Sequence, residues 1–161
     1  MPFRPFFRSA FILCAALAAP LFAPTAFGYA LEGPAWPDGR VVTLQMSLGN
    51  SGSTLQDGNT SWNVATLPAV DEWNASMARV QFATVMNSSV PLKSNDGKNS
   101  VIFTNDVFGA PFGTGVVAIT YYWTSGGNLT EAAVLFNQAE TFDSYRVGLQ
   151  FVSSKPDIVI R

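Results

Sequence analysis

The clearest pattern along the chain is an alternation of apolar and polar residues that returns several times. In residues 41–48, Val42, Leu44, Met46 and Leu48 fall on one face. A period of two is typical of a strand with one buried face. Further runs of β-prone residues occupy 79–86, 101–104, 116–124 and 129–137. The sequence therefore predicts five strands.

One segment between the first two strands has the spacing of a helix instead. The apolar residues that recur at this spacing are Trp62, Ala65, Ala69, Trp73 and Met77. Because burial of one helix face explains this spacing, we expect both tryptophans to pack into the core. Pro68 interrupts the pattern, so the helix either kinks there or begins near Leu67 with Thr66 as its N-cap.

The predicted order is strand, helix and then four strands, with no internal repeat. This order indicates the α/β (α+β) class, with a mixed five-stranded twisted sheet and one main helix on one face. A single helix covers such a sheet poorly. We therefore expect an incomplete domain.

The N-terminal residues resemble a secretory signal peptide. Arg4 and Arg8 precede an apolar run, 10–19, that is shorter than the roughly 20 residues of a membrane span. Small residues, Ala26 and Gly28, then offer a cleavage site. We expect a signal peptide over 1–28 and a mature chain over 29–161, secreted to the extracellular space or the periplasm without a stable membrane anchor. The alternative is a buried N-terminal helix.

The composition excludes several kinds of site. The chain contains no histidine, and its one cysteine, Cys14, lies in the predicted signal peptide. The chain therefore cannot form a Ser-His-Asp triad, a histidine-ligated zinc site or, after cleavage, a disulfide. Loss of the two charges of Arg4 and Arg8 would change the formal charge from −2 to −4. An acidic chain of this kind does not predict a nucleic-acid partner.

A set of short segments, in this order, resembles the N-terminal half of matrixin-type metzincin zinc metalloproteases of the secreted bacterial type. The segments are 31–37 (LEGPAWP), the helix with Ala69 and Trp73, 99–103 (NSVIF), 115–120 (GVVAIT), 129–132 (LTEA) with 136–137 (FN), and 141–145 (TFDSY). The likeness lies chiefly in residues 62–145 and covers most of the mature chain.

The resemblance implies that residues 29–161 are the N-terminal part of a metallopeptidase catalytic domain. The family's motif HExxHxxGxxH, which binds zinc and activates water, is absent and would begin just beyond Arg161. Such a protein would be a monomer that uses zinc and acts on protein or peptide substrates. The resemblance further implies that 129–137 forms the edge strand beside the substrate cleft. The candidate cleft residues are Leu129, Glu131, Ala133, Leu135 and Asn137.

Other chemistry receives weaker support from the sequence. The carboxylates of Asp96, Asp106, Glu131 and Asp143 could bind calcium, but their spacing matches no EF-hand loop. Glu140 and Asp143 are three residues apart and could form a carboxylate pair, although solvated surface charge explains them as well. We therefore assign no catalytic and no metal-binding residue.

The alternative function is a non-enzymatic, secreted, β-rich binding domain. Tyr121, Tyr122 and Trp123 are consecutive on a predicted strand, so they alternate between its two faces. Either two pack in the core and one under a loop, or at least one is exposed and can stack on a sugar or a peptide.

Overall fold

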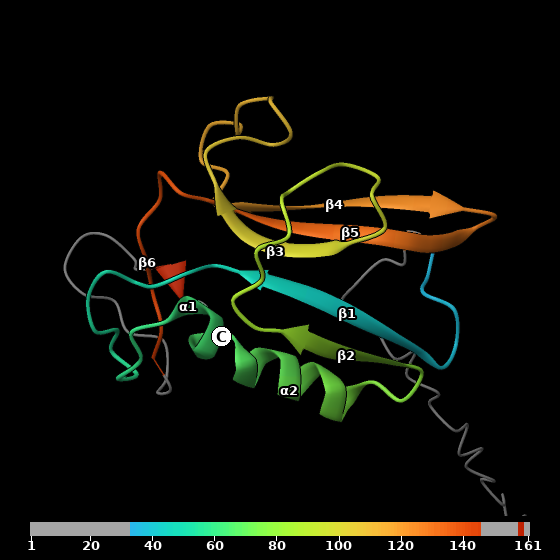
Figure 1. Ribbon diagram of the computed structural model, residues 1–161, viewed down its shortest axis with the longest axis horizontal. Helices are drawn as coiled ribbons and strands as arrows, with labels where there is room; N and C mark the ends of the chain where they lie inside the picture. The colour runs from blue at the N-terminus through green and yellow to red at the C-terminus, as the bar shows by residue number, and fades with distance from the viewer. Residues whose placement is uncertain (1–32, 146–157, 160–161) are drawn as a thin grey trace, which may run out of the picture. The chain divides into compact units, whose positions relative to one another are not determined.

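The computed structural model describes residues 33–145 and 158–159 (Figure 1). The predicted signal peptide therefore lies outside the described residues. Among those that are described, no helix has the length and apolar character needed to cross a membrane.

Five strands form one sheet, and a short helix pair follows the first of them. The elements in chain order are β1 (Arg40–Ser47), α1 (Trp62–Ala65), α2 (Leu67–Ser76), β2 (Val80–Val85), β3 (Asn99–Thr104), β4 (Ala118–Ser125), β5 (Asn128–Asn137), β6 (Phe142–Asp143) and β7 (Ile158–Val159). The order in the sheet is β2-β1-β3-β5-β4, and β6 pairs with β7 separately. The five predicted strands and the mixed α/β class are confirmed.

The pairing directions follow from the connections. Strands β2, β1, β3 and β5 are parallel neighbours, whereas β4 runs antiparallel to β5. A tight turn joins β4 to β5 through Gly126 (φ 58°) and Gly127 (φ 82°). Two successive residues with positive φ suit the twist of a two-residue hairpin, and glycine adopts that conformation without strain.

The helical segment begins anew after Thr66, as one of the two predicted alternatives requires. Pro68 occupies the first turn of α2, where its missing N–H removes no helical hydrogen bond. The Thr66 hydroxyl does not cap α2. It donates instead to the carbonyls of Trp62 (3.2 Å) and Asn63 (3.0 Å), so it stabilises the end of α1.

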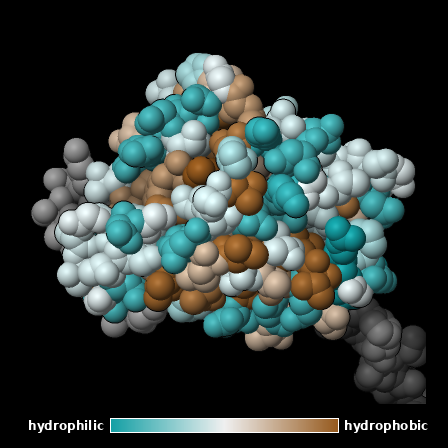
Figure 2. Space-filling model, viewed as in Figure 1, coloured by the Kyte–Doolittle hydropathy of each residue, from teal (hydrophilic) through white to brown (hydrophobic). Residues whose placement is uncertain are grey.

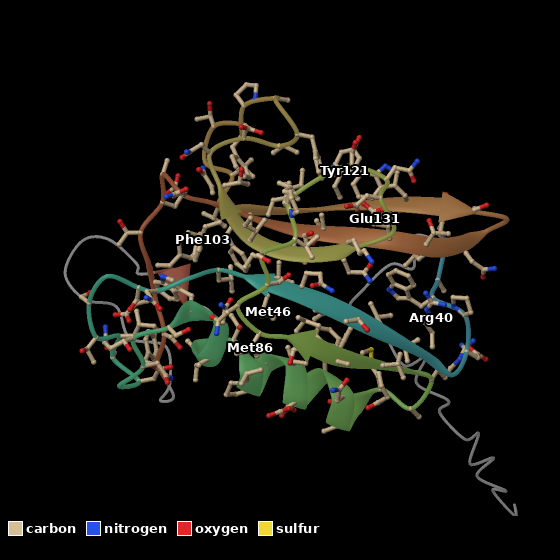
Figure 3. The ribbon with its side chains drawn as sticks, viewed as in Figure 1. Arg40, Met46, Met86, Phe103, Tyr121 and Glu131 are labelled. Carbon is tan, nitrogen blue, oxygen red and sulfur yellow. The ribbon has the colours of Figure 1, made fainter. Side chains whose placement is uncertain are left out.

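A core cluster forms where α1 meets the sheet. Its buried members are Met46, Leu48, Leu55, Trp62, Ala65 and Val101. Phe103 lies beside this cluster, with ring centroids 5.6 Å from Trp62, 5.4 Å from Phe136 and 5.2 Å from Phe142. In Figure 3, Met46 lies on β1, Phe103 on β3 and Met86 just after the end of β2.

The prediction that both tryptophans are buried is wrong for one of them. Trp62 is 9% exposed, but Trp73 is 60% exposed, and α2 contains no buried residue. Helical spacing places both on related faces of a continuous helix. The break at Pro68 changes this relation, because α1 packs into the core while α2 lies along the edge strand β2 (Figure 1).

Candidate functional site

The predicted cleft residues do not lie at a sheet edge. Strand β5 is an interior strand between β3 and β4, so the prediction that residues 129–137 form the edge is wrong. The hairpin brings β4 back on the outer side of β5, and β4 is therefore the edge. The physical reason is the pairing of β5 with β3, a contact between segments distant in sequence.

Four of the five predicted residues are also buried. Glu131 is 1% exposed, Ala133 2%, Leu135 0% and Asn137 8%. With Leu129, which is partly exposed, they alternate along β5 and so share one face of the sheet. A loop covers part of this face, because Asn137 Nδ2 donates to the carbonyl of Val116 (2.9 Å). These side chains form a packed layer and cannot line an open cleft.

The carboxylate of Glu131 is fully engaged in holding a second loop. Its Oε1 accepts from the Asn95 N–H (2.9 Å), and its Oε2 accepts from the Gly97 N–H (2.5 Å). Asn95 has a left-handed backbone (φ 56°), which costs free energy for a residue other than glycine, so the two bonds to Glu131 stabilise the turn. The role of Glu131 in this geometry is structural, since both oxygens have donors and the side chain is buried.

Strand β4 carries exposed apolar residues on both of its faces. Ile119 is 37% exposed, Tyr121 47% and Tyr122 40%. At least one aromatic of the Tyr-Tyr-Trp run is therefore exposed, which was one of the two predicted alternatives. On the face seen in Figure 2, the hydrophobic residues form separate patches with polar residues between them.

Three aromatic rings meet beside the edge strand, and we name them the aromatic triad: Phe108, Tyr121 and Trp123. The ring centroids are 5.8 Å apart for Phe108 and Tyr121, 5.4 Å for Phe108 and Trp123, and 5.3 Å for Tyr121 and Trp123. Tyr121 and Glu131 are labelled on this β4–β5 side in Figure 3. The triad confirms that residues 121 and 123 share a face, as alternation requires.

Phe108 has a backbone conformation that is unfavourable for its type. Its φ is 52°, in the left-handed region that costs an L-residue roughly 1–2 kcal/mol. Two contacts maintain the turn: Val107 N–H donates to the Ala110 carbonyl (2.7 Å), and Gly109 N–H donates to Asp106 Oδ1 (2.7 Å). The sequence analysis missed Phe108, and the Phe-Gly pair in a glycine-rich loop was the only signal for it.

The opposite edge of the sheet is closed by a polar side chain. Asn74 of α2 donates from Nδ2 to the Phe82 carbonyl (2.9 Å), and its Oδ1 accepts from the Phe82 N–H (2.7 Å). The amide thereby occupies the position of a neighbouring strand. Gln81 Nε2 also donates to the carbonyls of Asn74 and Met77 at the end of α2.

The candidate carboxylate pair is not assembled as a pair. Asp143 Oδ2 accepts from Gln56 Nε2 (2.7 Å), and Oδ1 accepts from the N–H groups of Gln56 and Ser144. Asp143 thus anchors the loop that follows β1. Glu140 lines a separate cavity, and within residues 33–145 its carboxylate has no hydrogen-bond or ion-pair partner.

The described residues do not gather into a metal site. In residues 33–145 and 158–159, no group of three histidine, cysteine, aspartate or glutamate side chains could hold a metal ion. The candidate calcium ligands are dispersed, and two of them, Glu131 and Asp143, are occupied by the contacts given above. The zinc site of the matrixin family needs histidines, and this chain has none, so its residues do not fit that metal.

Comparison with known proteins gives no relative: no protein family model, no curated protein and no solved structure matches this chain.

Proposed function

We propose that this chain is the N-terminal part of the catalytic domain of a secreted, matrixin-like zinc metalloendopeptidase, and that β4 binds an extended substrate peptide. The observation that carries the proposal is that β4 is the outer strand of a mixed sheet and pairs, among the described residues, with β5 alone. The ordered sequence resemblance supports the family.

An open strand edge binds peptides by a simple mechanism. An extended peptide adds one more strand through main-chain hydrogen bonds, and its alternate side chains contact the two faces of the sheet. On β4 those faces carry Tyr121 on one side and Tyr122 on the other, both exposed. We expect the peptide to be held by its backbone and selected by apolar side chains beside these rings.

The zinc chemistry of the family has no residue of this chain assigned to it. In such enzymes, a zinc-activated water attacks the peptide carbonyl. Because this chain has no histidine, its contribution under the proposal is substrate positioning. The purified 161-residue chain should therefore not hydrolyse peptides, and zinc-dependent cleavage by it would contradict this assignment.

The family assignment is tested by the genomic DNA that follows the Arg161 codon, translated in all three forward frames. The proposal expects HExxHxxGxxH within a few codons. A stop codon at that point, with no such motif in any frame nearby, would overturn the assignment to a protease.

The role of β4 is tested separately by amide hydrogen exchange with and without an extended, apolar peptide. We expect the peptide to slow exchange in residues 118–125 at least several-fold, because edge amides gain acceptors. Residues 80–85 of the closed edge are the internal control and should not change. Equal slowing at both edges would show non-specific association instead.

A second candidate function is a non-enzymatic binding domain, and the aromatic triad is the observation that favours it. Partly exposed aromatic rings can stack on sugars as well as on peptide side chains. Titration with soluble oligosaccharides would distinguish the two, because a sugar should perturb the Trp123 indole signal without slowing exchange in β4. Cooperative unfolding of the isolated chain would favour the binding domain, whereas a molten chain would favour part of a larger catalytic domain.

A further inference from the structure

A cavity of about 200 Å³ opens at the end of the sheet where three parallel strands finish. Its lining includes Leu48 after β1, Phe103 near the end of β3 and Gln138 after β5. The connection after β1 leads to one side of that strand, while β3 lies on its other side. Crevices outside the carboxyl ends of strands at such a switch point are frequent ligand sites in open α/β sheets.

The walls of this cavity are aromatic. Trp62, Phe103 and Phe142 line it, and the Phe103 ring stands nearly edge-on to both others, at interplanar angles of 63° and 62°. A dry cavity of 150 Å³ accepts a benzene-sized group. The cavity here is of a similar size and is open to solvent, so it can take a short alkyl chain together with a polar head.

Three polar side chains line the same cavity, and none has a partner. The Asn50 amide, the Gln138 amide and the Glu140 carboxylate make no hydrogen bond or ion pair within residues 33–145. Glu131 provides the contrast, because its carboxylate is nine-tenths or more buried and bonded at both oxygens. Asn50 and Gln138 are exposed and Glu140 is half-buried, so all three are free to meet the polar head of a ligand beside the aromatic wall.

Main-chain hydrogen bonds fix the backbone beside Asn50 and Gln138. Trp62 N–H donates to the Gly49 carbonyl (2.9 Å), and Asn50 forms a β-bridge with Ser61. Gln138 N–H donates to the Thr104 carbonyl (3.0 Å). The cavity is therefore formed before any ligand arrives, which reduces the entropy cost of binding.

We propose that this cavity binds an organic cation, an alkylammonium or alkylguanidinium group, with the head at Glu140 and the alkyl chain against Trp62, Phe103 and Phe142. The only charged residue of the lining is acidic, and no lysine or arginine of residues 33–145 lines the cavity. An alkyl chain that packs against the aromatic wall is removed from water, which favours binding. The site goes beyond the proposed function, since its lining includes no residue of β4.

The test is a titration of the full chain with n-butylammonium and n-butylguanidinium, followed by the indole N–H signal of Trp62 in NMR spectra. That signal is assigned by its loss in Trp62→Phe. n-Butanol is the neutral probe of the same length. Both cations should move the Trp62 signal, and n-butanol should bind at least about tenfold more weakly, because it lacks the charge that Glu140 attracts.

Two variants and a control test the role of the charge. Glu140→Gln keeps the shape and should weaken cation binding about tenfold. Gln138→Glu adds a second carboxylate and should tighten it several-fold, a gain that misfolding cannot imitate. Glu72→Gln, an exposed change on α2 outside the cavity, should have no effect. Equal binding of n-butanol, or unchanged binding by both cavity variants, would overturn the proposal.

The source of the cation is distinguished by a further probe, acetyl-arginine-amide. If it binds as well as n-butylguanidinium, the cavity accepts the basic side chain of a peptide. If the two butyl cations bind and acetyl-arginine-amide does not, the ligand is a small organic cation. Both results support the proposed chemistry, and neither depends on β4, so failure here leaves the peptide-edge proposal standing.

Discussion

At one edge of the sheet helix α2 closes strand β2, whereas at the other edge strand β4 has no further strand beside it in the described part of the chain. The closed edge uses one amide, Asn74, to satisfy both the N–H and the carbonyl of Phe82. The open edge instead carries exposed Tyr121 and Tyr122. Exposed strand edges favour unwanted pairing, so natural proteins usually cover or charge them.

The difference teaches where a sheet of this kind can bind a strand. The β2 edge is protected by helix α2, which has no buried residue. The helix closes this edge through the hydrogen bonds of its Asn74 side chain. The β4 edge lacks this protection but is supported from behind by β5, whose Glu131 fixes a neighbouring loop. Four substitutions test these assignments, from the largest expected effect to the smallest.

Glu131→Ala should lower the free energy of unfolding by about 3–5 kcal/mol, because each of two bonds to a charged acceptor contributes about 1.5–3 kcal/mol. Glu131→Gln keeps one carbonyl acceptor and should cost about half as much. Denaturant unfolding measures both. A loss of less than 1 kcal/mol for the alanine variant would contradict the structural role.

Asn74→Ala should cost about 2 kcal/mol and promote self-association, because it leaves the Phe82 N–H and carbonyl without their partners. Ser76→Ala, at an exposed position on the same helix, is the matched control and should change stability by less than about 0.5 kcal/mol. Denaturant unfolding and analytical ultracentrifugation give the two readouts. Equal behaviour of the two variants would show that β2 is not closed by the amide.

At position 108, glycine should be more stable than alanine by about 1 kcal/mol, because only glycine adopts a φ of 52° without a steric cost. Both variants lose the same ring contacts with Tyr121 and Trp123, so thermal unfolding isolates the backbone term. Phe112 lies in the same loop and has no positive φ. At position 112, the glycine variant should be no more stable than the alanine variant. A preference for glycine at both positions would refute the explanation.

The smallest effect on stability is expected for Thr120→Lys, an exposed change on β4 that should alter unfolding by less than about 0.5 kcal/mol. Its effect on association should be larger, because lysine on an open edge opposes strand pairing. Ala83→Lys on the closed strand β2 is the control. If high protein concentration causes dimers, only the β4 change should reduce them in sedimentation experiments.

The strands were predictable because their pattern is local. Val42 and Met46 are 2% and 1% exposed, as their alternation requires, and the hairpin turn carries two glycines. The exposure of Trp73 was not predictable in the same way. Trp62 and Trp73 have equivalent positions in a helical pattern, and only the packing of α1 and α2 against different parts of the sheet distinguishes them.

The candidate site was only partly predictable for the same reason. Two adjacent β-prone runs joined by a glycine turn indicate an antiparallel pair, but they do not say which member pairs with β3. The structure places β5 inside and β4 outside, which moves the candidate edge by one strand. The unpartnered carboxylate of Glu140 had no sequence signal that separated it from Asp143, whose carboxylate is engaged.

The sequence by itself determined the strands, the helical segment with its break near Pro68, and the absence of histidine chemistry from this chain. These features depend on residue type and on spacing over a few residues. Only the tertiary structure decided the edge strand, the exposed tryptophan, the buried role of Glu131 and the cavity beside Glu140. Each of these depends on contacts between segments far apart in sequence, such as β3 with β5, which local patterns do not specify.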